Sequence, residues 1–89
     1  MNTKHKPIDG GVWVNESMRL AQTAAKRLYE RGLSASLIVR DLHKYGHPLS
    51  DVAFAVRHFP ELDAMLFSQI WGGSEDEQRT ARIKFLEWK

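Results

Sequence analysis

Apolar residues recur at steps of three and four through five stretches of this chain, and glycine or proline marks most of the junctions between them. That spacing places apolar side chains on one face of an α-helix, whereas a half-buried strand would show strict alternation. Glycine just after a helix and proline near a helix boundary are common stop signals. We therefore predict an all-α protein, a compact bundle of about five short helices in residues 15–89, preceded by an N-terminal arm over residues 1–14.

Cap residues mark the expected starts of the helices. Asn15 and Ser34 each precede an apolar repeat, and such side chains accept a hydrogen bond from a backbone N–H group of the first turn. Ser74 is followed three residues later by glutamate, which is the spacing of a capping box. We expect the third helix to begin after Ser50 and to end at Pro60, which would also suit the first turn of the fourth helix.

The fourth and fifth helices carry more apolar surface than one core-facing stripe needs. A helix that is apolar nearly all round is either central in the fold or in contact with a partner. Two interpretations therefore stay open: all of these side chains are core, or some of them form a dimer or partner interface, where aromatic residues and methionine are enriched. The second interpretation predicts the interface residues Phe67, Trp71, Ile83, Phe85 and Leu86.

Several function classes have no support in the residues. The chain contains no cysteine, which removes disulfides, thiolate metal ligands and thiol nucleophiles together. His43 and His47 have the spacing of a helical metal pair, but Gly46 is expected to end the helix between them. No Gly-x-Ser-x-Gly motif or phosphate-binding loop occurs. We expect a non-enzymatic protein without metal, cofactor or small-molecule substrate.

Neither a membrane-spanning run nor a secretory signal is apparent, so we expect a cytoplasmic protein with no membrane partner. Basic residues gather in the middle of the chain. Residues 17–59 hold seven Lys or Arg against three acidic residues, whereas residues 60–89 hold four against six. This distribution suits an anionic partner on one face, although an ordinary solvated helix surface gives the same pattern.

Residues 34–59 have the outline of a helix-turn-helix unit, in which the second helix lies in the major groove of DNA. A basic arm at residues 4–6 would reach a minor groove. Against this hypothesis, His47 and Pro48 lengthen the turn, and any two consecutive short helices share the outline. The residues assigned to nucleic acid are Lys26, Arg40, Lys44, His47, Ser50, Phe54 and Arg57.

The sequence thus predicts a small DNA-binding regulator of bacterial or phage type. It would bind DNA through a basic face of the first three helices and form a homodimer through the fourth and fifth. The alternative is a protein-binding module, an inhibitor or adaptor of phage or plasmid type that docks through the fourth and fifth helices. A third option is binding of RNA or a single strand by stacking on Tyr29 and Tyr45, which lie beside basic residues. Both tyrosines are expected on core-facing sides of their helices, which favours a core role for them.

Overall fold

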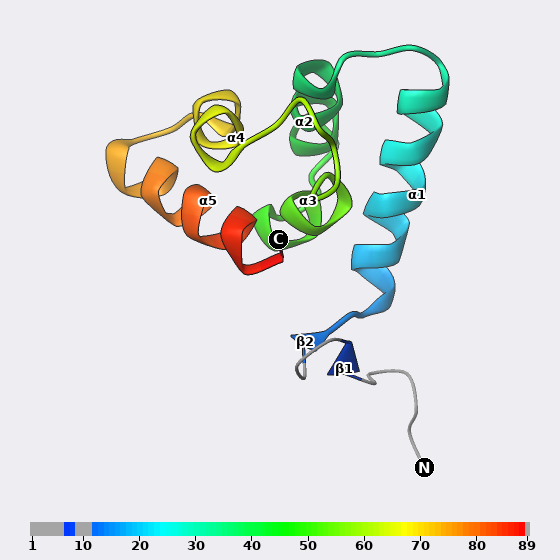
Figure 1. Ribbon diagram of the computed structural model, residues 1–89, viewed down its shortest axis with the longest axis horizontal. Helices are drawn as coiled ribbons and strands as arrows, with labels where there is room; N and C mark the ends of the chain where they lie inside the picture. The colour runs from blue at the N-terminus through cyan, green and yellow to red at the C-terminus, as the bar shows by residue number, and fades with distance from the viewer. Residues whose placement is uncertain (1–6, 9–11, 89) are drawn as a thin grey trace.

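Five α-helices account for most of the chain (Figure 1). The computed structural model describes residues 7–8 and 12–88, with side chains from Val14 onward. Within the arm, Pro7–Ile8 (β1) pairs antiparallel with Val12–Trp13 (β2). The predicted all-α architecture is confirmed. The helices are α1 Glu16–Glu30, α2 Ala35–Lys44, α3 Leu49–Ala55, α4 Ala64–Trp71 and α5 Glu75–Trp88. The basic residues 4–6 of the arm lie outside the described part.

Three helices begin at the predicted cap residues. The side chain of Asn15 accepts a hydrogen bond from the Met18 backbone N–H at 3.0 Å, and Ser34 caps α2 in the same way at 3.3 Å. At the start of α5, the Ser74 N–H donates to Glu77 Oε1 at 2.7 Å and the Glu77 N–H donates to Ser74 Oγ at 3.2 Å. The capping box therefore forms as the sequence predicts.

The start of α3 differs from the sequence expectation. The helix begins at Leu49 with Pro48 as its N-cap in an extended conformation, so Ser50 lies inside the first turn and does not cap it. It ends at Ala55 rather than at Pro60. Successive turns then lead the chain through residues 56–61.

Proline does not open α4. The Asp63 carboxylate accepts a hydrogen bond from the Leu66 N–H at 2.7 Å and is the N-cap of this helix. A carboxylate at this position satisfies a first-turn N–H group and lies at the positive end of the helix, which favours a start after Asp63. In the described part of the chain, no helix is both long and apolar enough to cross a membrane.

The short helix α3 lies at the centre of the molecule. Helix α1 packs along one side of it, α5 packs on the other side, and α4 packs between α5 and α2 (Figure 1). Every residue from Asp51 to Val56 is buried as a result. One of the two interpretations of the sequence places the fourth helix at the centre of the bundle. The structure places α3 there, and α4 exposes Met65 and Gln69 to solvent.

Much of the apolar surplus of the fourth and fifth helices lies in the core. Phe67 and Phe85 are completely buried, and their rings pack with centroids 5.1 Å apart. Phe54 packs edge-on against Trp88 of α5 with ring centroids 5.1 Å apart, in a smaller cluster with Val14 and Met18 at the start of α1. The prediction that Phe67 and Phe85 line an exposed interface is therefore wrong, because the contact between α4 and α5 already covers both rings.

Candidate nucleic-acid interface

The buried position of α3 changes which residues can reach a ligand. Phe54 is 4% exposed, so the prediction that it contacts bases is wrong. The Arg57 guanidinium lies 3.8 Å from the Phe54 ring centroid, and its Nη1 donates to the Phe54 carbonyl at 2.6 Å. Burial lowers the pKa of Arg57. Ser50 is half-buried. Every residue from Asp51 to Val56 is buried, so α3 presents few side chains that could read a major groove, which counts against the helix-turn-helix hypothesis.

The predicted phosphate contacts on α1 and α2 have a different environment. Lys26, Arg40 and Lys44 are exposed, and none forms an ion pair with another described residue. Both ion pairs in the described part lie within α5, at 3.7 Å and 3.5 Å. His47 is half-buried in the turn before α3. The cations of α1 and α2 are therefore free to meet an external anion.

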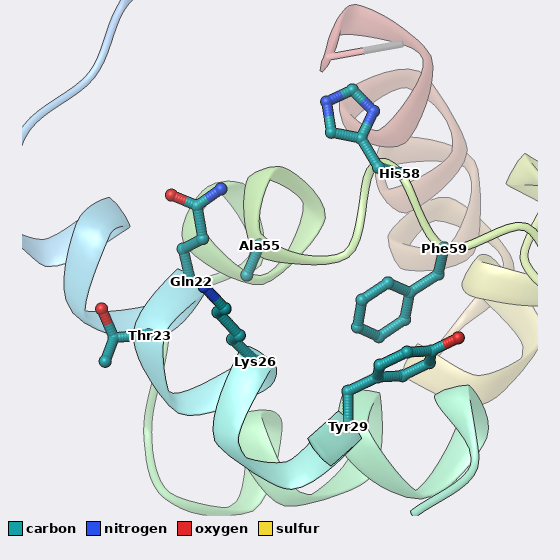
Figure 2. A pocket seen from close by; sticks show the side chains of 7 residues that line it. All are labelled: Gln22, Thr23, Lys26, Tyr29, Ala55, His58 and Phe59. Atoms are coloured by element: carbon teal, nitrogen blue, oxygen red, sulfur yellow. The ribbon is translucent and has the colours of Figure 1, made fainter.

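A groove of about 470 Å³ runs between α1 and the chain that leaves α3 (Figure 2). This volume lies within the range of about 300–1,000 Å³ that is usual for ligand sites. We call it the α1 groove. Its lining residues are Gln22, Thr23, Lys26, Tyr29, Ala55, His58 and Phe59.

Helical spacing and one turn build the α1 groove. Gln22, Lys26 and Tyr29 are separated by four and three residues, so they follow one another along the same side of α1. On the facing side, the Phe59 N–H donates to the Val56 carbonyl at 3.0 Å and closes the turn after α3. This turn brings the Phe59 ring to a centroid distance of 5.0 Å from Tyr29, at an interplanar angle of 34°.

The chemistry of the α1 groove is aromatic and cationic. Figure 2 shows the Tyr29 and Phe59 rings together at one end, Lys26 and Gln22 along α1, and the His58 imidazole on the opposite rim. None of the lining residues is acidic. Arg19 is exposed and lies two helical turns before Lys26, on the same side of α1. The groove thus offers ring surface, donors and positive charge.

The exposure of the tyrosines corrects the sequence interpretation. Tyr29 is 44% exposed and Tyr45 is 75% exposed, although both were expected to face the core. Tyr29 lies at the edge of the apolar stripe of α1, and Tyr45 follows the last residue of α2 as its C-cap. The terminal position of each ring is the signal in the sequence that favours exposure, since a last-turn side chain has fewer neighbours to cover it.

A smaller pocket of about 260 Å³ has the opposite charge. Its lining residues are Leu49, Trp71, Asp76, Glu77 and Thr80. The His43 imidazole stacks on the Trp71 indole with ring centroids 3.7 Å apart, so this tryptophan is half-buried rather than a free partner surface. Hydrogen bonds from the Ser74 backbone N–H and hydroxyl hold the pKa of Glu77 below its usual range, and the charge of His43 adds to the effect.

Two predicted interface residues remain accessible. Ile83 is 51% exposed and Leu86 is 60% exposed, and they lie three residues apart on the outer face of α5. Two side chains make a small apolar patch, and isolated exposed apolar residues are common on soluble proteins. No group of three or more potential metal ligands occurs among the residues that the structure describes.

Comparison with known protein families, with characterised proteins and with solved structures finds no match to this chain.

Proposed function

We propose that the protein is a non-enzymatic nucleic-acid-binding protein that contacts phosphates through the exposed faces of α1 and α2. One observation carries this proposal: Lys26, Arg40 and Lys44 are exposed and form no ion pair with another described residue. The paired cations of α5, Arg79 and Lys84, differ because carboxylates of the same helix lie beside them. A nucleic-acid partner is also what the sequence predicts, but here α3 does not enter the major groove of DNA.

Phosphate contacts of this kind predict a measurable salt dependence. Each neutralised phosphate of a duplex releases counterions and contributes about −0.9 to the slope of log K against log salt concentration. Three contacts give a slope near −2.7, which corresponds to a loss of affinity of about 40-fold between roughly 50 and 200 mM salt. Binding that depends on apolar contacts alone would change little over this range.

Fluorescence anisotropy with labelled mixed-sequence duplexes and single strands tests the proposal. The double variant Arg40→Glu/Lys44→Glu should weaken binding strongly, because it replaces two phosphate contacts with repulsive charges. The control variant Arg79→Glu/Lys84→Glu makes the same charge change on α5 and should bind much better than the first variant. Absence of binding at about 50 mM salt, or an equal loss in the two variants, would contradict the proposal.

A second candidate function rests on the apolar pair at Ile83 and Leu86. This patch would support a homodimer or a protein partner, as the alternative interpretation of the sequence expects. Light scattering gives the mass of the protein in solution directly. If the patch is a dimer seam, the wild type is a dimer and the folded variant Ile83→Asp/Leu86→Asp is a monomer. A monomeric wild type removes the homodimer.

A further inference from the structure

We infer that the α1 groove binds one nucleotide of a single strand, with the base against Tyr29 and Phe59 and the phosphate beside Lys26. This inference rests on the proposed function and names the form of nucleic acid that the protein takes.

The aromatic end of the α1 groove supplies a stacking surface. Tyr29 and Phe59 support each other at a centroid distance of 5.0 Å, yet Tyr29 remains 44% exposed. Every nucleobase has a π-face, so an aromatic side chain of this kind accepts bases with little regard to sequence. The two rings come from different elements, α1 and the turn after α3, so their contact joins the two sides of the groove.

The remaining lining residues match the rest of a nucleotide. Lys26 supplies a positive charge, and the imidazole of His58 supplies a further donor at the opposite rim. The Gln22 amide can donate and accept, as the edge of a base requires. The absence of acidic side chains from the lining means that no carboxylate repels a phosphate there. The volume of about 470 Å³ is large enough for a group of this size.

The same features favour a single strand over a duplex. In a duplex the bases are stacked on one another and offer only their edges, through the two grooves. Stacking on a protein ring requires an unstacked base, which single strands and loops provide. The helix that would read a major groove, α3, is buried. The α1 groove therefore suits an unstacked base, as single strands provide.

The test compares three labelled probes of equal length: a mixed-sequence single strand, its duplex, and an abasic single strand that keeps the phosphates but lacks the bases. Anisotropy should show that the wild type binds the normal single strand more tightly than the abasic strand or the duplex. Tyr29→Ala should weaken binding of the normal strand by roughly 5- to 150-fold, the usual effect of removing one stacked base. Its affinity for the abasic strand should change little.

Three variants keep the result interpretable. Tyr29→Phe retains the ring and should restore tight binding, whereas Lys26→Gln keeps the aromatic end and should weaken both single strands to a similar extent. Tyr45→Ala removes an exposed ring outside the groove and should bind like the wild type. Circular dichroism establishes that each variant is folded. Because Lys26 is an exposed residue of α1, its variant remains informative if Tyr29→Ala does not fold.

The outcomes separate the inference from the proposed function. Equal affinity of the wild type for normal and abasic strands, or unchanged affinity in folded Tyr29→Ala, overturns the inference while salt-dependent binding still supports the proposed function. Failure of all three probes to bind at about 50 mM salt overturns both. An acidic, tyrosine-containing peptide that binds in a Tyr29-dependent way, when no strand does, would assign the groove to a protein partner and also overturn both.

Discussion

Replacing Phe85 by alanine tests whether this side chain of α5 belongs to the core or to an interface. Phe85 is completely buried and packs against Phe67 at a ring-centroid distance of 5.1 Å. Truncation at this site removes the whole ring from the contact between α4 and α5. Helix α5 also packs against α3, and α4 also packs against α2, so the two helices cannot close the space without distorting other contacts.

The expected loss is large for a chain of this size. A Phe→Ala change at a fully buried site costs about 3–5 kcal/mol, which combines lost transfer free energy with the cavity left behind. A domain of 89 residues has a free energy of unfolding of roughly 4–13 kcal/mol in total. The melting temperature should fall by about 12 °C or more, since each kcal/mol corresponds to roughly 4–8 °C in a domain this small.

Urea unfolding followed by circular dichroism measures this loss, and light scattering reports the oligomeric state of the same samples. Ile83→Ala is the matched control, because this side chain is 51% exposed on the same helix and should change the free energy of unfolding by about 0.5 kcal/mol or less. Phe85→Asp should unfold the protein, whereas Ile83→Asp should not. A stable, folded Phe85→Ala variant that loses less than about 1 kcal/mol would refute the core assignment.

Three further predictions concern capping, backbone conformation and a buried carboxyl group. Glu77→Ala should lower the free energy of unfolding relative to wild type. This difference should shrink as the pH falls through the lowered pKa of Glu77, because protonation removes the same stabilisation from the wild type. Urea titrations at several pH values would contradict this if the difference stayed constant. Gly73→Ala should lower the melting temperature more than Gly32→Ala does. Both glycines have a positive φ, but only at Gly73 would the new Cβ lie 2.5 Å from Glu77 Oε1. Equal losses of melting temperature would contradict this. Asp51→Asn should raise the free energy of unfolding by about 1 kcal/mol in urea titrations. Asp51 is buried and its Oδ2 has no hydrogen-bond partner among the described residues, so a neutral amide avoids the cost of burying a charge there. A decrease would show that the carboxyl group has a favourable role.

Local signals in the sequence predict the helices well and their arrangement poorly. Asn15, Ser34 and Ser74 each act within one turn of the chain, so their side chains identify the caps without knowledge of the fold. Periodicity also shows that Phe54 lies off the main stripe of its helix. It does not show that Trp88, more than thirty positions later, packs against that ring. Which faces are covered depends on contacts between distant segments.

The candidate site was predictable only in part, for the same reason. Lys26, Arg40 and Lys44 were identified from charge and helical position, and the structure leaves all three exposed. The α1 groove joins residues 22–29 to residues 55–59 and contains no sequence motif. Its aromatic end depends on the meeting of Tyr29 with Phe59 across that interval. A single sequence gives no signal for a pair of this kind.

The central position of α3 has a consequence for how the molecule opens. Among the described elements, α3 is the only one that packs against both α1 and α5. Its backbone amides should therefore exchange with solvent only when the whole protein unfolds, whereas the outer turns of α1 and α5 should exchange through smaller, local openings. A change that loosens α3 would let the two sides of the molecule fluctuate independently, and the protein would lose its single cooperative transition before it lost its helices.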